Sequence, residues 1–244
     1  MAGKKKDKAK AEENIKEETT ELIEKPNSMQ AIMSIGLAET LYLEDRRDRI
    51  LYLDGEVDED VLHTLIMQIC KINGEDYGKP LNERVPITLI INSGGGNAIV
   101  GMALVNAIQT SCTPVIGVCL GICASMAFGV FAVCHKRISV ADATFMVHDG
   151  YEYNSCMTTT KAQDWAKFSP RLSNRYNKAI ASRTKFTVKE LEEMSPHDVW
   201  YFADDLVEMG MVDGIIGKDI ALGEIFSFMS DYDCDCDCDC DCDE

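Results

Sequence analysis

The sequence predicts an α/β protein built on a mostly parallel sheet. Short apolar runs alternate with helical patterns from residue 50 to residue 216, as expected when crossover helices join parallel strands. Two of these runs, "PITLIIN" (86–92) and "PVIGVCL" (114–120), are apolar at nearly every position. Such runs are typical of strands covered on both faces, which predicts helices packed around the sheet.

The first half of this region predicts three strand-to-helix units. A strand is expected over Ile50–Leu53, with a turn at Gly55 and with Asp58 capping the helix in "EDVLHTLIMQICKIN". The strand "PITLIIN" leads through the loop "SGGGN" into the helix "AIVGMALVNAIQTS". The strand "PVIGVCL" leads into the helix "SMAFGVFAVC", which Ser125 begins.

The second half adds strands and a long helix. "RISVAD" and "TFMVHD" are expected to be strands, 157–183 a long helix and 187–195 a shorter one. "WYFADDLVEMGMVDGII" predicts a helix, a stop at Gly210 and a last strand.

The length of 244 residues fits one generous domain with tails. Residues 1–28 are expected to be a charged, disordered segment, and residues 29–48 a helix or loop. The main domain, a C-terminal extension and a Cys-Asp tail are expected at 49–217, 218–230 and 231–244. Strict Cys-Asp alternation offers no apolar face to bury. The tail is therefore expected to be disordered and dispensable for activity, although its thiols and carboxylates are also metal-ligand types.

Composition bears on partners and compartment. The formal net charge is −17, and residues 230–244 hold eight acidic residues and no basic one. An acidic body with an acidic tail argues against nucleic-acid binding through phosphates. The apolar run 115–134 is interrupted by glycines, which favours a buried strand and helix over a membrane span. A charged start without a signal peptide, together with scattered cysteines among apolar residues, predicts a cytoplasmic protein with reduced thiols.

The loop at Gly94, Gly95 and Gly96 is the first candidate site. Glycines between a strand and a helix let the backbone approach a ligand and offer it N–H groups. On the triplet alone, a plain tight turn is the favoured interpretation. The pattern is neither a dinucleotide fingerprint, because Ile99 stands where the third glycine belongs, nor a phosphate loop, because no Gly-Lys-Ser/Thr follows.

Three side chains at element boundaries are further candidates. Ser125 sits at a helix start, where it is either a cap or a nucleophile near free N–H groups. His148 closes the strand "TFMVH", and Asp198 in "SPHDVW" would by itself be an ordinary helix cap. Together, however, a serine, a histidine, a carboxylate and a glycine loop are the parts that a serine hydrolase requires.

No metal site or organic cofactor is predicted. The body has no H-E-x-x-H motif and no paired C-x-x-C motif. The remaining histidines, His63, His135 and His197, have no partner suggested by the sequence.

From about Arg49 to Ile216 the chain resembles the Clp protease proteolytic subunit, the ClpP family of serine peptidases. The matching segments are "ILYLDGEVDED", "LIINSGGGNAIVGMALVNAI", "GICASMAFGVFAVCHKRISVADATFMVHDG" and "DVWYFADDLVEMGMVDGII". The resemblance implies that Ser125 is the nucleophile, His148 the base and Asp198 the orienting carboxylate. It also implies an oxyanion hole made by the N–H groups of Gly96 and Met126.

The chain departs from the family pattern at several positions. Gly94 stands where the family usually has proline, and Ala127 where it usually has glycine. Asp149-Gly150 replaces a Gln-Pro pair, and the segment between the serine and the histidine is slightly shorter than usual. These departures indicate a divergent member, with a phage-encoded protein as one interpretation, and they bear on the substrate groove and partner choice.

The resemblance implies repeated ββα units with a long handle helix, a fold shared with the crotonase superfamily. It further implies a homo-oligomer of heptameric rings stacked as a tetradecamer, protein and peptide substrates, and an ATP-driven unfoldase of the Clp class as partner. Two alternatives stay open at this point. One is a crotonase-type acyl-CoA enzyme without a serine nucleophile, and the other is a ClpP-like ring subunit that assembles but does not cut.

Overall fold

The computed structural model describes residues 37–150 and 158–226. The expectations for residues 1–28 and for the Cys-Asp tail, 231–244, therefore lie outside the described residues. The chain divides into two units, Met1–Asp48 and Arg49–Glu244. The described part of the first unit is helix α3 (Leu37–Arg47), which ends in two arginines. A helix or an ordered loop is the sequence expectation for this stretch.

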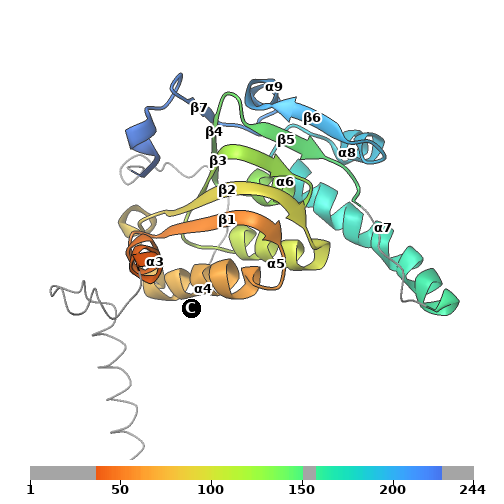
Figure 1. Ribbon diagram of the computed structural model, residues 1–244, viewed down its shortest axis with the longest axis horizontal. Helices are drawn as coiled ribbons and strands as arrows, with labels where there is room; N and C mark the ends of the chain where they lie inside the picture. Colours follow the sequence, from red (N-terminus) through yellow and green to blue (C-terminus); the bar gives the residue numbers. More distant parts are fainter. Residues whose placement is uncertain (1–36, 151–157, 227–244) are drawn as a thin grey trace, which may run out of the picture. The chain divides into compact units, whose positions relative to one another are not determined.

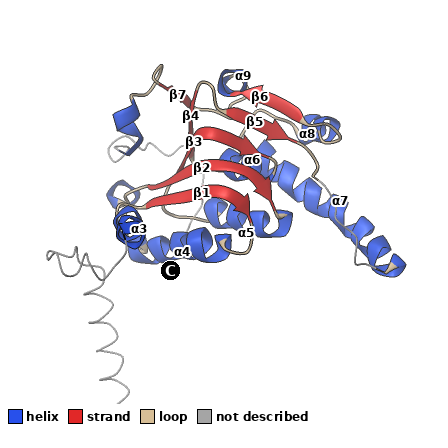
Figure 2. Ribbon diagram, in the orientation of Figure 1, coloured by secondary structure: helices blue, strands red, loops and turns tan. Residues whose placement is uncertain are grey.

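The second unit is organised around a seven-stranded sheet, counted over the described residues (Figure 2). Its order is β1-β2-β3-β4-β7, while β5 pairs with both β3 and β6. All pairs are parallel except β5–β6, which is antiparallel. The strands are β1 (Ile50–Val57), β2 (Ile87–Gly96), β3 (Val115–Ala124), β4 (Lys136–Val140), β5 (Thr144–Val147), β6 (Val199–Phe202) and β7 (Gly214–Ile216). The predicted α/β class with a mostly parallel sheet is confirmed.

Helices cover one face of this sheet (Figure 1). A π-helical turn (Leu62–Ile66) continues into α4, and the long α7 runs outward beyond the sheet. The α-helices are α4 (Met67–Asp76), α5 (Ala98–Gln109), α6 (Met126–Ala132), α7 (Thr159–Ala181), α8 (Val188–Met194) and α9 (Ala203–Val207). Two short 3-10 turns occupy Leu81–Glu83 and Leu222–Phe226.

The main core lies between the sheet and helices α4, α5 and α6. Alternate side chains of the strands point into it, as at Leu51 and Leu53 of β1, because strand side chains alternate between faces. Helix α6 is buried along its whole length, from Met126 to Ala132, so it packs as an internal element. The apolar run 115–134 is thus β3 followed by α6. Among the described residues, no helix is both long and apolar enough to cross a membrane.

Two details in the first half of this unit differ from the sequence expectation. Asp58 accepts a hydrogen bond from the Asp60 N–H, but the helix itself begins only at Leu62, after a turn. Within the described residues of this unit, helices pack on one face of the strand "PITLIIN". On its other face Ile90 joins a small cluster with Ile116, Val118 and Ile138, and Asn92 is exposed. Few apolar side chains of the described chain reach that face, so it carries a second, smaller core.

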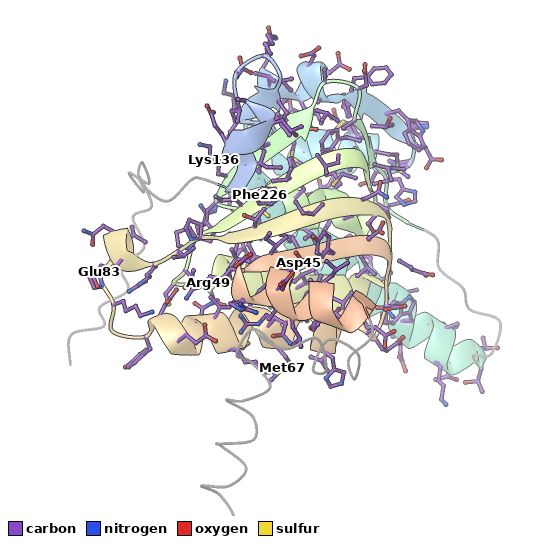
Figure 3. All side chains as sticks on the ribbon, turned by 60° about the vertical axis from the view of Figure 1, so that its left-hand side comes forward. Asp45, Arg49, Met67, Glu83, Lys136 and Phe226 are labelled. Carbon is purple, nitrogen blue, oxygen red and sulfur yellow. The ribbon has the colours of Figure 1, made fainter. Side chains whose placement is uncertain are left out.

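Arg49, labelled in Figure 3, lies just before β1 and fixes the start of that strand through a buried ion pair. The Arg49 guanidinium donates to both carboxylate oxygens of Asp76 at the end of α4, with its Nη2 2.8 Å from Oδ1. Asp76 also accepts from Lys79 and from the Thr113 hydroxyl, each at 2.8 Å. Burial alone would raise the pKa of Asp76, but these three donors outweigh it and hold the pKa well below the usual range. The carboxylate therefore stays charged and ties α4 to the sheet.

Candidate active site

Ser125 occupies the turn between the central strand β3 and the buried helix α6. The first half of β3 pairs with β4, from Ile116 to Cys119, and its last residues pair with β5, from Ile122 to Ala124. The change of partner brings the end of β3 beside the end of β5. The Ser125 N–H then donates to the Met146 carbonyl of β5 at 2.8 Å. This bond fixes the serine at the edge where β5 ends.

His148 reaches Ser125 because it directly follows β5. Because Ala124 pairs with Met146, the ends of β3 and β5 lie side by side. Ser125 follows the first strand and His148 the second, so the two residues are neighbours. The His148 ring nitrogen Nε2 lies 2.7 Å from the Ser125 Oγ. Its side chain is 10 % exposed, so the ring lies mostly out of water.

Asp198 comes to His148 through the antiparallel pairing of β5 with β6. Val147 pairs with Val199, so His148 and Asp198 stand opposite each other as the next pair of the ladder. The Asp198 Oδ1 lies 3.1 Å from His148 Nδ1, and its side chain is 47 % exposed. Asp198 is followed by strand β6 rather than by a helix. The ordinary helix-cap interpretation of this aspartate is therefore wrong.

Ser125 has an unusual backbone conformation. Its φ is +53° and its ψ is −122°, and Arg49 is the only other non-glycine residue with positive φ in the described part of the chain. A side-chain-bearing residue held in a sparsely populated region costs on the order of 1–3 kcal/mol. The sharp turn aims the Ser125 Oγ at His148 instead of back at helix α6, and the side chain accepts no capping bond from the N–H groups of that helix.

The glycine loop closes on this serine from β2. Gly95 has a φ of +93°, and a Cβ added there would lie 2.7 Å from the Ala124 carbonyl oxygen and 2.8 Å from the Met126 nitrogen. No side chain fits in that space. Gly94 has nothing within 4 Å of such a Cβ, so the close approach is required at the middle of the triplet and not at its start.

Two backbone N–H groups of the loop already donate hydrogen bonds. The Gly95 N–H donates to the Ser93 Oγ at 3.1 Å, and the Asn97 N–H donates to the Val57 carbonyl at 2.7 Å. Gly96 lies between these two residues. Gly96 and Met126 both line the same groove as Ser125 and His148.

That groove has a volume of about 990 Å³ and runs between the glycine loop and helix α7. One stripe of α7 forms a wall, with side chains at helical spacing: Trp165, Ser169, Leu172, Ser173 and Tyr176. Sequence reasoning predicts the long helix but not its part in the site. The spacing of these residues on the predicted helix 157–183 is the signal that would have found them, although any helix packed on a core carries such a stripe.

The other candidate groups do not join the site. Among the described residues, no group of three histidine, cysteine or acidic side chains could hold a metal ion. His135 accepts a bond from the Val115 N–H at its Nδ1, and desolvation together with nearby Arg183 lowers its pKa to about 4. Cys119, Cys123 and Cys134 are free and buried.

Residues 37–219 match the family described as Clp protease. The chain belongs to the Clp protease family. Among its relatives in this family are two described as "ATP-dependent Clp protease proteolytic subunit 3", from Synechococcus sp. (strain CC9902) and Synechococcus sp. (strain CC9605). Each is 27% identical over 173 residues, which cover 69% of this chain and 82% of the relative. A "proteolytic subunit 2" from Prochlorococcus marinus (strain MIT 9312) is also 27% identical, with 81% of its length covered.

These matches confirm the predicted resemblance and its divergence, since about a quarter of the aligned residues are identical. Membership in the Clp protease family makes this chain a relative of peptidases. The hydrogen-bonded groups of Ser125, His148 and Asp198 are of the types that a serine peptidase uses.

The close approach at Gly95 gives a direct test of the loop. Gly95→Ala should lower the free energy of unfolding by about 1–3 kcal/mol, because the new Cβ meets backbone atoms at a positive φ. It should also lower activity, because the loop must move away from Ser125. Peptide hydrolysis and thermal melting, measured together, check both effects. Gly94→Ala is the matched control for stability, because nothing lies within 4 Å of its added Cβ, and it should melt close to wild type. An equal loss of stability in the two variants would contradict the account.

Proposed function

We propose that this protein is a serine endopeptidase of the ClpP type, with Ser125 as nucleophile, His148 as general base and Asp198 as orienting carboxylate. The observation that carries the proposal is the continuous chain of contacts, 2.7 Å from Ser125 Oγ to His148 Nε2 and 3.1 Å from His148 Nδ1 to Asp198 Oδ1. Family membership over residues 37–219 supports it independently.

The proposed reaction has two halves. The Ser125 Oγ attacks the scissile carbonyl carbon while His148 Nε2 takes its proton, and the protonated His148 then gives that proton to the leaving amine. A water molecule next attacks the acyl-enzyme, again losing a proton to His148, and Ser125 regains its proton as the acid product leaves. Asp198 holds the imidazole with Nδ1–H toward its carboxylate, which leaves Nε2 as the proton acceptor. No metal or organic cofactor takes part in these steps.

The oxyanion of each tetrahedral intermediate needs two N–H donors. We assign the N–H groups of Gly96 and Met126, which line the groove beside Ser125. The Gly95 and Asn97 N–H groups are already engaged with Ser93 and Val57, which supports Gly96 as the donor from the loop.

The groove favours a peptide substrate over an acyl-CoA. Its volume of about 990 Å³ and its open course along α7 suit an extended chain. A crotonase-type acyl-CoA enzyme would use the oxyanion donors without a nucleophile, so it would have no need for a serine in contact with a histidine and a carboxylate. A ring subunit that assembles but does not cleave peptides would likewise have no need for the strained turn at Ser125.

We further propose that the subunits form heptameric rings, stacked in pairs, in the cytoplasm, and that an ATP-driven unfoldase of the Clp class delivers folded substrates. The relatives' printed description as ATP-dependent proteolytic subunits supports this assembly. So do Trp200 and Phe202, which are 53 % and 58 % exposed on the edge strand β6, because large exposed aromatic side chains are typical of contact surfaces.

Substitution of the nucleophile separates catalysis from structure. Ser125→Ala should lower peptide hydrolysis roughly 10³-fold or more, while the free energy of unfolding changes by at most about 1–2 kcal/mol. His148→Ala should lose about as much activity, because the three residues act as a unit. Asp198→Asn should lose less, since this half-exposed side chain orients rather than reacts. Initial rates on a short fluorogenic peptide and melting temperatures measure these effects.

Ser139→Ala is the matched control for that series. Its buried hydroxyl donates to the Cys119 carbonyl at 3.2 Å and lies on β4, outside the groove. The variant should retain hydrolysis while showing a similar small loss of stability. Retained hydrolysis by Ser125→Ala would reject the proposed mechanism.

The assembly is tested by mass. Light scattering on the purified full chain should give a particle many times the subunit mass of 27.1 kDa. A stable monomer that cleaves peptides at the full rate would contradict the ring but not the nucleophile.

A further inference from the structure

Helix α7 reaches the nucleophile turn through the hydroxyl of Tyr176. The Tyr176 Oη donates a hydrogen bond to the backbone carbonyl of Ser125, with an oxygen–oxygen distance of 2.7 Å. The same carbonyl accepts from the Phe128 N–H of α6 at 3.0 Å. Two donors from two different helices therefore converge on the carbonyl of the serine that has the strained backbone.

The tyrosine ring reaches this carbonyl because α6 has a glycine beneath it. Gly129 lies in the second turn of α6, and a Cβ added there would collide with the Tyr176 ring. Glycine within a helix is ordinarily unfavourable. Its presence here makes room for the ring to lie against the helix backbone, so the position of the hydroxyl is fixed by packing.

The hydroxyl remains a donor over the working pH range. Desolvation raises the pKa of Tyr176, and the nearby Cys123 raises it further. A tyrosine that does not ionise keeps its O–H proton for the Ser125 carbonyl.

The bonded carbonyl and the Met126 N–H belong to the same peptide group. A peptide group is planar, so fixing the direction of its C=O also fixes the direction of its N–H. A hydrogen bond accepted at the oxygen also polarises the group and makes the N–H a stronger donor. The Met126 nitrogen faces the glycine loop, 2.8 Å from where a Gly95 Cβ would lie, on the groove side of the turn.

We propose that Tyr176 is a positioning residue for the oxyanion site: its hydroxyl holds and polarises the Ser125–Met126 peptide so that the Met126 N–H is aimed at the developing negative charge. The inference rests on the proposed function, since it assumes that Met126 donates to the oxyanion. Tyr176 does not touch the reacting atoms. It acts through one peptide group.

The proposal predicts a specific kinetic signature for Tyr176→Phe. Removal of the hydroxyl should lower kcat on the order of 10-fold, less than loss of an oxyanion donor itself, because the Met126 N–H is still present but less well held. KM for a short fluorogenic peptide should change by less than about 2-fold, since the ground-state carbonyl is bound nearly as before. Rates are expressed per active site, counted with a phosphonylating probe, on the full chain in its assembled form.

A tetrahedral inhibitor gives the readout that a purely structural role would not move. A peptide boronate forms a tetrahedral adduct on the serine and places an oxygen where the oxyanion develops. Its inhibition constant should rise in Tyr176→Phe by about the same factor as kcat falls. A packing role alone would lower the melting temperature or the number of active sites, without changing kcat per site.

Tyr201→Phe is the matched control. Its hydroxyl donates to the Met194 Sδ at 3.0 Å, its ring packs against the same core, and within the described residues no hydrogen bond joins it to the serine turn. This variant should keep wild-type kcat, KM and boronate inhibition. The Ser125 carbonyl retains the Phe128 bond in Tyr176→Phe, so that variant should melt within a few degrees of wild type.

The outcomes separate this inference from the function on which it rests. If wild type hydrolyses peptides and Tyr176→Phe matches it in kcat per site and in boronate inhibition, the positioning role is rejected and the peptidase assignment stands. A Tyr176→Phe protein that no longer melts cooperatively would also reject it, because the bond would then serve the fold. If wild type itself neither hydrolyses peptides nor takes the probe, the proposed function fails.

Discussion

The site depends on the position of β5 between β3 and β6. Parallel pairing with the end of β3 places His148 beside Ser125, and antiparallel pairing with β6 places Asp198 opposite His148. A shift of either register by one residue would turn the following side chain to the other face of the sheet. One short strand, Thr144–Val147, thus sets both contacts of the histidine.

Ser125, His148 and Asp198 differ in how far the surrounding structure encloses and restrains them. Ser125 follows a buried strand and precedes a helix that is buried at every position, so its turn has little freedom to relax. His148 is mostly enclosed, whereas Asp198 is half-exposed. Two hydrogen bonds from segments distant in the sequence hold the peptide groups on either side of the strained residue. The Ser125 N–H donates to the Met146 carbonyl, and the Tyr176 hydroxyl donates to the Ser125 carbonyl.

Much of this arrangement can be predicted from the sequence, because it follows from local patterns. The runs leading into the glycine loop and into Ser125 are strongly apolar and end in small residues, which identifies both the strands and their boundaries. Long-range pairing cannot be predicted in that way. Asp198 by itself reads as a helix cap, and only the β5–β6 register, between segments fifty residues apart, places it at the histidine. Tyr176 gives no local signal, because its role depends on space left by Gly129 in another helix.

The central claim is that Ser125 is a nucleophile activated by His148. The most direct measurement is labelling of the full chain with a fluorophosphonate, followed by peptide mass mapping of the modified residue. One adduct per chain is expected on the peptide that contains Ser125, and it should be lost in His148→Ala because the serine then has no proton acceptor. Equal labelling of His148→Ala, or an adduct on another serine with Ser125 unmodified, would contradict the account.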